Sequence, residues 1–258
     1  MLLSEHRREV LLPLADSPNA PAIVHALDEL FGTPTASLRP LLDVLVGEDS
    51  ILYELASLVS EPGANQQTVH ADMPFTKECV LYTAFLALQD VTFDMGPTTF
   101  LPNTHASAEP HTKLKDDNNP PLFVKNEFLK QSQPRLALLH AGDVVVFDSR
   151  ALHCGGRNDP NKGSTRALFN FSFTNPTTTT TTTLFQQGGV NMASIRPGYA
   201  TRPLTLGTLC RELVVAAANT NGNDPFQAWG DGLGPEGDEM TKQREQYRRQ
   251  RNTPEGCL

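Results

Sequence analysis

The segment from Arg166 to Phe173 alternates polar and aromatic side chains with a period of two. Successive side chains of a β-strand point to opposite faces, so this pattern predicts a strand with two unlike faces. We expect the face that begins with Arg166 to line a ligand site and the aromatic face to pack on supporting helices. The polar face carries Arg166, Leu168, Asn170 and Ser172, and the other face carries Phe169, Phe171 and Phe173.

Further strands are predicted along the middle of the chain, which makes the fold mainly β. The apolar run 79–89 has Thr83, Phe85 and Gln89 on one face, which we expect to line the interior of a barrel. Residues 51–59 are compatible with a strand or a short helix. Shorter strands are expected at 98–101, 136–140 and 144–147 and around His153.

Apolar residues at helical spacing predict supporting helices near the N-terminus and once more after the strands. The first fifty residues are interpreted as a helical buttress, with segments at 10–14, 22–31 and 37–46. A further helix is expected at 206–218. None of these segments carries a recognisable chemical motif.

The sequence Thr68-Val-His-Ala-Asp72 places a histidine and a carboxylate two residues apart. On an extended segment His70 and Asp72 point the same way, so both can reach one metal ion. His153 is the best candidate for a third ligand. Two histidines and one carboxylate on one face of a metal suit non-haem Fe(II) and oxygen chemistry. The guanidinium of Arg166 could hold the far carboxylate of a dicarboxylic acid.

The 258-residue chain carries a formal net charge of −8, which argues against non-specific binding to nucleic acid. The four scattered cysteines, with no CxxC pair, favour a reduced, cytoplasmic setting. No apolar stretch of membrane-spanning length and no signal-peptide layout is present, so no membrane association is expected.

We interpret the chain as one domain with residues 51–175 as its β core. The polar insertion 106–134 is expected to be a mobile lid with few apolar anchors that closes over the metal. Residues 176–258 form a C-terminal extension that includes the low-complexity run Thr177 to Thr183.

Five motifs, taken in order, resemble those of the phytanoyl-CoA dioxygenase-like family of Fe(II)- and 2-oxoglutarate-dependent oxygenases. They are Gln67-x-x-His70-x-Asp72, Gly96-Pro-Thr-Thr-Phe-Leu-Pro-Asn-Thr-His105, Ala141-Gly-Asp-Val-Val-Val-Phe147, Leu152-His-Cys-Gly-Gly-Arg-Asn158, and Arg166 on the last strand. The resemblance covers about residues 50 to 175. It has Asn103 where the family typically has glycine, a mild change because Asn tolerates positive φ.

The resemblance implies a double-stranded β-helix, a jelly-roll barrel related to the cupins. It implies that His70, Asp72 and His153 bind Fe(II) and that Arg166 pairs with the C5 carboxylate of 2-oxoglutarate. Thr83 and Gln67 are further candidates to hydrogen-bond a 2-oxoglutarate carboxylate, and Arg157 competes with Arg166 for the anchoring role.

The implied activity uses O2 to hydroxylate an unactivated C–H bond of a small molecule, with release of succinate and CO2. Asp72 favours hydroxylation over halogenation, because halogenating relatives have a small residue there. Desaturation or cyclisation by the same centre, and a non-catalytic ligand-binding barrel, are the alternatives. A zinc hydrolase is disfavoured because no separate general base stands out. The sequence leaves the substrate, including whether it is a CoA thioester, and the oligomeric state open.

Overall fold

The computed structural model describes residues 6–15, 17–115, 121–176, 195, 204–218 and 226. The threonine run and most of the C-terminal extension therefore lie outside the described residues. The chain divides into two compact, interleaved units, Met1–Val10 with Ser57–Asn170 and Asn252–Leu258, and Leu11–Ala56 with Phe171–Arg251. The first unit holds every candidate ligand. The interpretation of the chain as one oxygenase domain stays a prediction.

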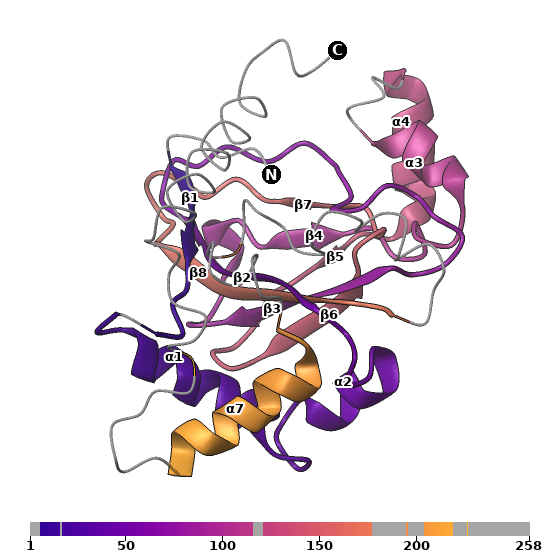
Figure 1. Cartoon of the computed structure of the whole chain (residues 1–258). Coiled ribbons are helices and arrows are strands. Elements are labelled where there is room, and N and C mark those ends of the chain that lie inside the picture. Colours follow the sequence, from indigo (N-terminus) through magenta and orange to yellow (C-terminus); the bar gives the residue numbers. More distant parts are fainter. Residues whose placement is uncertain are drawn as a thin grey trace, which may run out of the picture. The chain divides into compact units, whose positions relative to one another are not determined.

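The described residues form two antiparallel sheets (Figure 1). One sheet has the strand order β1-β2-β8-β3-β6 and the other β5-β4-β7. The strands are β1 Arg7–Leu11, β2 Leu52–Ser60, β3 Leu81–Ala87, β4 Thr98–Phe100, β5 Arg135–Leu136, β6 Val144–Asp148, β7 His153–Gly155 and β8 Arg166–Thr174. A short 3-10 helix, η2 (Phe93–Met95), precedes β4.

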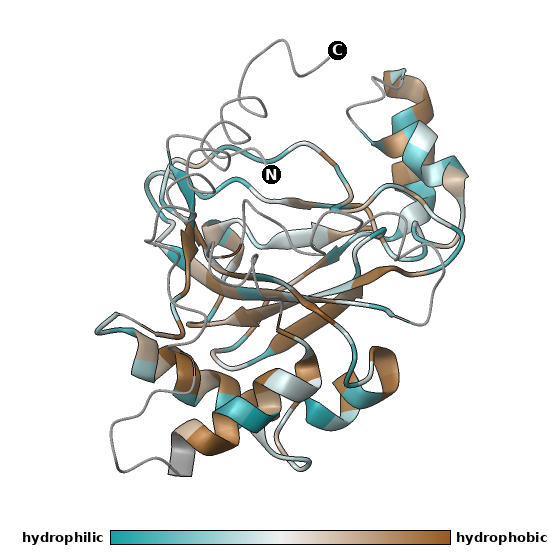
Figure 2. Ribbon diagram, viewed as in Figure 1, coloured by the Kyte–Doolittle hydropathy of each residue, from teal (hydrophilic) through white to brown (hydrophobic). Residues whose placement is uncertain are grey.

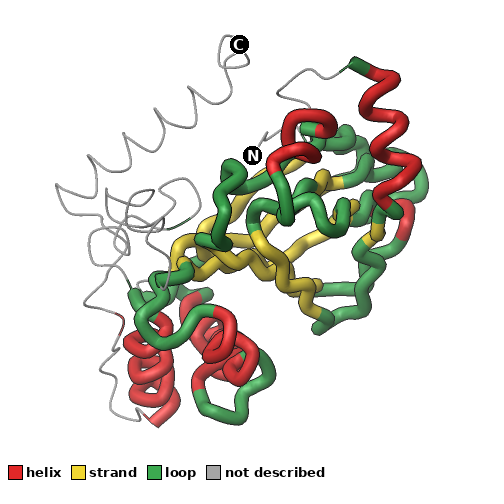
Figure 3. The backbone as a smooth tube through the Cα atoms, turned by 90° about the vertical axis from the view of Figure 1, so that its right-hand side faces the viewer, coloured by secondary structure: helices red, strands yellow, loops and turns green. Residues whose placement is uncertain are grey.

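The inner faces of the two sheets meet in the first unit, where aromatic rings from both form a core. Phe100 of β4 lies 6.5 Å from Phe85 of β3 and 4.9 Å from Phe147 of β6, measured between ring centroids. Figure 3 shows the two layers of strands, and Figure 2 shows the hydrophobic colouring of β3 and β6. Two facing antiparallel sheets are the architecture of the predicted jelly-roll, which is thus confirmed.

Strand β3 has the predicted inner face. Its register pairs Thr83 with Phe147 and Phe85 with Val145 of β6. Directly paired residues share a face of the sheet, so these four side chains point into the barrel together. Thr83 and Phe85 are buried, whereas Leu88, just after the strand, is 52% exposed.

The insertion differs from the expected polar lid, because it folds into two helices, α3 (Ala108–Leu114) and α4 (Leu122–Ser132). Leu114 is fully buried, and Phe128 and Leu129 of α4 pack against the same apolar cluster. The described part of the insertion thus has a few apolar anchors, while Leu122 and Phe123 are each 72% exposed. A single buried leucine in α3 was too sparse a pattern to reveal an amphipathic helix.

The second unit contains most of the predicted helices, namely α1 (Ala20–Leu27), the π-helical turn η1 (Asp28–Gly32), α2 (Arg39–Leu45) and α7 (Leu206–Ala218). Pro21 lies in the first turn of α1, where a proline costs no hydrogen bond. The ring of Phe31 packs at 5.8 Å from Phe171 and 5.9 Å from Phe173. The aromatic face of β8 therefore meets a helix, as predicted.

One predicted helix is a strand. Residues 10–14 were expected to be helical, but β1 covers Arg7–Leu11 and pairs beside β2. The amide of Leu12 continues this pairing by donating to the carbonyl of Leu55 at 3.3 Å. Residues 51–59, left open between helix and strand, are a strand. A short apolar run does not distinguish the two, so pairing with a neighbour decides.

The described cysteines Cys79, Cys154 and Cys210 are not joined by disulfide bonds. Within the described residues, no helix is both long and apolar enough to cross a membrane.

Candidate metal centre and cosubstrate crevice

The three predicted ligands lie together in the first unit. The Nε2 atom of His70 is 3.9 Å and that of His153 is 3.6 Å from the same oxygen, Oδ1 of Asp72. Their ligand atoms all lie within 4.8 Å of one another, the only such group of histidine, cysteine and acidic side chains among the described residues. Two imidazoles and one carboxylate at these separations fit one divalent transition metal.

Backbone pairing brings the two histidines together although they are far apart in sequence. His70 and His153 form an antiparallel bridge, with N–H to O distances of 3.0 and 2.8 Å. Residues directly opposite in such a pair have their side chains on one face. The imidazole centroids are 4.6 Å apart as a result.

Each histidine has its other ring nitrogen engaged by the backbone. Nδ1 of His70 lies 2.8 Å from the carbonyl of Thr68, and Nδ1 of His153 lies 3.0 Å from that of Ala151. A carbonyl only accepts, so each Nδ1 carries the proton and each Nε2 presents its lone pair to a metal. Burial and the nearby His153 lower the pKa of His70 to about 4, which keeps the ring neutral at physiological pH.

Helices α3 and α4 support the ligands from behind. The residues next to the ligands, Val69, Leu152 and Cys154, form an apolar cluster with Leu101 and Leu114, on which Phe128 and Leu129 pack. Side chains that alternate with metal ligands point to the opposite face of the chain. The described helices of the insertion therefore pack on the back of the ligand segments, and the closure of the insertion over the metal stays a prediction.

The turn that carries Asn103 is tied to the strand of His153. Asn103 has φ of 65°, the left-handed conformation that glycine would favour. The buried hydroxyl of Thr104 donates to the Leu101 carbonyl at 2.7 Å and accepts the Leu152 amide at 2.8 Å. The turn at Asn103 and Thr104 thus fixes the position of Leu152, the residue before the proposed ligand His153.

The predicted cosubstrate residue Thr83 lies beside Ser149, with 2.7 Å between the hydroxyl oxygens. Met73 follows Asp72 in the chain, and its amide donates to the carbonyl of Ser149 at 3.0 Å. Thr83 does not line the crevice that contains Arg166. Its observed contacts support the loop after a ligand.

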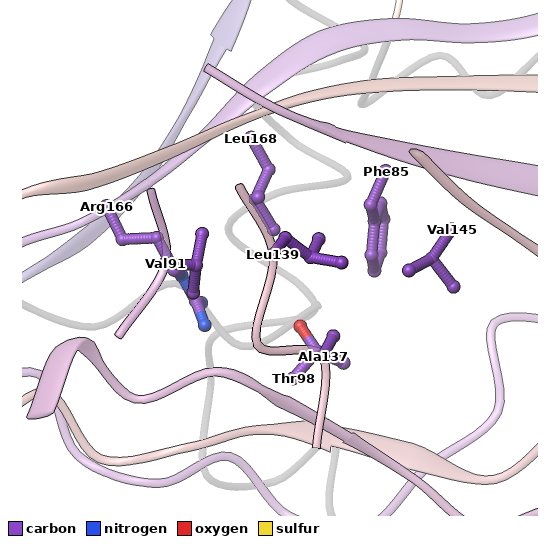
Figure 4. A pocket seen from close by; sticks show the side chains of 8 residues that line it. All are labelled: Phe85, Val91, Thr98, Ala137, Leu139, Val145, Arg166 and Leu168. Atoms are coloured by element: carbon purple, nitrogen blue, oxygen red, sulfur yellow. The ribbon is translucent and has the colours of Figure 1, made fainter. Parts of the chain in front are cut away.

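Arg166 is buried in a narrow crevice between the sheets (Figure 4). Figure 4 shows Arg166 and Val145 at opposite ends, with Leu139 between them. The crevice has no room for a water molecule, so a ligand would have to displace side chains. Its other lining residues are Phe85, Val91, Thr98, Ala137 and Leu168.

The guanidinium of Arg166 donates from one terminal nitrogen to the carbonyl of Gly96. Burial, with the positive charge of Arg7, lowers the pKa of Arg166 to about 10, which leaves it charged at neutral pH. The competing candidate Arg157 is exposed in the loop after β7 and borders a surface hollow with Asp94 and Asp159. The contrast in burial favours Arg166 as an anchor.

Gln67 pairs twice with Gly155, through its backbone amide at 2.9 Å and through Oε1, which accepts the Gly155 amide at 2.8 Å. Its Nε2 is buried without a hydrogen-bond partner. A Cβ at position 155 would lie 2.5 Å from Oε1 of Gln67, so glycine is required for this approach. Gln67 therefore presents an unused donor near the Arg166 end of the site.

A wider groove of about 630 Å³ lies next to rings that pack on His153, although none of the three proposed ligands lines it. Phe100 and Phe147 line it, and their ring centroids lie 5.7 and 5.1 Å from that of His153. His105, the last residue of the motif that begins at Gly96, also lines this groove. The remaining lining residues are Tyr82, Leu101, Pro102, Asn103, Arg135, Leu136, Ala137, Leu138, Leu139, Val145, Val146, Asp148 and Ala151.

Sequence reasoning missed Arg7, Thr98 and Phe100. Arg7 lies in the N-terminal region that was predicted to be helical but contains β1. Thr98 lines the crevice beside Arg166. Phe100 pairs directly with His153 in the β4–β7 ladder. The alternation of residues 98–101 could have placed Thr98 and Phe100 on one face, but only the pairing shows which face is inside.

The converging side chains of His70, Asp72 and His153 in a jelly-roll form an arrangement that suits a non-haem metal centre. The model of the phytanoyl-CoA dioxygenase (PhyH) family matches residues 4–166. The chain belongs to this family. No curated protein matches it.

Several solved structures are similar at low identity. The non-heme alpha ketoglutarate dependent epimerase SnoN from nogalamycin biosynthesis is 21% identical, with a TM-score of 0.48 over 67% of this chain and 66% of that one. HygX from Streptomyces hygroscopicus, solved with nickel, 2-oxoglutarate and hygromycin B, is 15% identical, with a TM-score of 0.46 over 67% and 71%. AviO1 from Streptomyces viridochromogenes is 17% identical, with a TM-score of 0.45 over 68% and 76%. The chain therefore spans just under two thirds of SnoN.

Proposed function

We propose that this protein hydroxylates a C–H bond of a small molecule, with His70, Asp72 and His153 as the iron ligands and Arg166 as the anchor of 2-oxoglutarate. The observation that carries the proposal is that both Nε2 atoms lie near the same oxygen, Oδ1 of Asp72. The distance is 3.9 Å from His70 and 3.6 Å from His153. With both Nδ1 atoms held by carbonyls, the histidines are oriented for a metal before it binds.

The bound Fe(II), 2-oxoglutarate and O2 together supply C–H oxidation, with release of succinate and CO2. The chain's own residues orient the reactants and exclude water from the metal centre. The rings of Phe85, Phe100 and Phe147 pack around that of His153, with centroids 6.4, 5.7 and 5.1 Å away, and give this ligand apolar surroundings. An apolar wall limits access of water to a reactive centre.

The register of β4 and β7 sets the spacing between the metal and the anchor. Phe100 pairs with His153 and Thr98 with Gly155, so the crevice around Thr98 and Arg166 lies two residues further along the ladder. Two residues of strand span roughly 7 Å. This separation suits a five-carbon dicarboxylate that reaches from the metal to Arg166.

The substrate would enter through the groove lined by Phe100 and Phe147. Its wall is largely apolar, with Leu136 and Leu138 43% and 54% exposed, and Arg135 and His105 are polar groups on its lining. Such a groove fits a small molecule with an apolar body and a few polar groups. Asp72 fills the ligand position that a halide would need, which favours hydroxylation over halogenation.

The test is a 2-oxoglutarate turnover assay with iron-loaded protein and a panel of small amphipathic metabolites, with succinate and product both measured. A hydroxylase forms one hydroxylated product per succinate, and the Asp72→Ala variant forms neither. Products with a new double bond or ring would show desaturation or cyclisation instead. No substrate-stimulated succinate from the wild-type protein, with metal and 2-oxoglutarate shown to bind, would favour a non-catalytic barrel.

A further inference from the structure

Arg7, on strand β1, is an arginine that is only 4% exposed. One terminal nitrogen donates to the carbonyl of Gly156 at 3.1 Å, while its Nε is buried without a partner. None of the ion pairs among the described residues includes Arg7 or Arg166. A buried charge without a counterion is costly, so these two residues call for an explanation.

The guanidinium of Arg7 lies over the inner face of the metal-bearing strand. A Cβ at Gly155 would stand 3.4 Å from Cζ of Arg7. Gly155 is two residues from His153, so the two positions share a face of β7. Because Gly155 has no side chain, the guanidinium of Arg7 fills the space on the inner face of β7 that lies one side-chain position away from His153.

Arg166 reaches the same part of the barrel from β8, which belongs to the other sheet. Thr98, which lines the Arg166 crevice, is the direct partner of Gly155. Arg166 donates to the Gly96 carbonyl and Arg7 to the Gly156 carbonyl. These two glycines touch, since a Cβ on Gly96 would lie 2.5 Å from the Gly156 oxygen. The charge of Arg7 accordingly adds to the burial that lowers the pKa of Arg166.

Three buried donors at this level lack acceptors, namely Nε of Arg7, Nε of Arg166 and Nε2 of Gln67. All three carry N–H groups and none can accept, so their shared requirement is for an acceptor with negative charge. A carboxylate offers about four lone-pair positions and no donor. It would satisfy the orphaned donors and neutralise part of the doubled positive charge at once.

We propose that Arg7 is a second binding residue for the distal carboxylate of 2-oxoglutarate, opposite Arg166, so that strand β1 forms part of the cosubstrate site. The assignment rests on the proposed function, in which Arg166 anchors that carboxylate. It makes the site selective for 2-oxo acids with a second carboxylate, because a 2-oxo acid without one leaves two buried cations unpaired.

The experiment measures binding of 2-oxoglutarate and of 2-oxobutyrate, which lacks the distal carboxylate, to the Fe(II)-loaded protein without O2. Arg7→Gln is expected to raise the Kd of 2-oxoglutarate by about tenfold to a hundredfold. The Kd of 2-oxobutyrate should change by less than about twofold. Arg8→Gln is the matched control, because Arg8 has a 65% exposed side chain and pairs with Glu61 at 2.6 Å. It should leave both constants at their wild-type values.

Thermal unfolding of the metal-free variants guards against a purely structural effect. Arg7→Gln should unfold at or above the wild-type temperature, because it removes an unpaired buried charge. The proposal is overturned if Arg7→Gln binds 2-oxoglutarate as the wild type does, or if it weakens both 2-oxo acids alike. Wild-type protein that binds Fe(II) but no 2-oxoglutarate would instead overturn the proposed function, and this assignment with it.

Discussion

His70 and His153 face each other across two backbone hydrogen bonds of 3.0 and 2.8 Å, although they are 83 positions apart in the sequence. The bridge places both side chains on the inner face, and carbonyls of Thr68 and Ala151 orient the rings. Asp72 is two residues after His70, so its side chain points the same way and completes the group of three ligands. The backbone therefore prepares the site before any metal arrives.

The anchoring role of Arg166 predicts a specific loss of cosubstrate affinity. Arg166→Ala should raise the KM for 2-oxoglutarate by about one to three powers of ten, on the order of a lost buried charge-assisted pair. Arg157→Ala should leave it unchanged, since Arg157 is exposed. Steady-state kinetics at saturating iron give the comparison. The opposite ranking of the two variants would transfer the role to Arg157.

The buttress behind the ligands predicts that α3 contributes to stability. Leu114 is fully buried against Val69 and Leu152, which adjoin the two histidines. Leu114→Ala should lower the free energy of unfolding by about 2–5 kcal/mol, as for other buried leucines. Thr112→Ala, at an exposed position of the same helix, should cost under about 1 kcal/mol. Denaturant unfolding measures both, and equal losses would show that α3 is not held by this leucine.

The pair formed by Arg150 and Asp148 predicts a loss of stability in acid. Burial alone would raise the pKa of Asp148, but hydrogen bonds and the charge of Arg150, at 2.5 Å, lower it below its usual value. A carboxyl with a lowered folded pKa stabilises the fold above its unfolded pKa of about 3.9 and loses that contribution as pH falls through the folded pKa.

Asp148→Asn should therefore cost about 3 kcal/mol at pH 7, because it leaves Arg150 buried without its partner. The gap to the wild type should narrow below about pH 4. Glu127→Gln is the control, since its pair with Lys130 is exposed and should change stability by under about 1 kcal/mol. Urea unfolding from pH 7 to pH 3 tests this. A gap that does not depend on pH would mean that the ion pair is not the source of the loss.

The strands and ligands that follow simple alternation could be predicted from the sequence. In β8 the period of two assigned Phe171 and Phe173 to one face and Arg166 to the other, and the structure agrees. The His70 and Asp72 spacing is also local information. The sequence also offered His153 as the best candidate for a third ligand, and the resemblance to a family implied all three residues together as iron ligands.

Features that depend on pairing could not be predicted in the same way. β1 is a strand because it lies beside β2, and its residues alone have no clear period. The burial of Arg7 follows from that pairing and from the missing side chain of Gly155. Helix α3 buries Pro110, His111 and Leu114, a set with too little apolar periodicity to detect from the sequence. In each case a neighbour far away in sequence decides the structure.

The most direct test of the account is a titration of metal-free protein with Fe(II) in the absence of O2, followed by calorimetry. The account predicts one tight site per chain, and His70→Ala, Asp72→Ala and His153→Ala should each weaken binding by at least about a hundredfold and nearly abolish turnover. His140→Ala, at an exposed histidine, should bind as the wild type does. Wild-type protein without a tight site, or His153→Ala with full affinity, would contradict the assignment of His70, Asp72 and His153 as the metal centre.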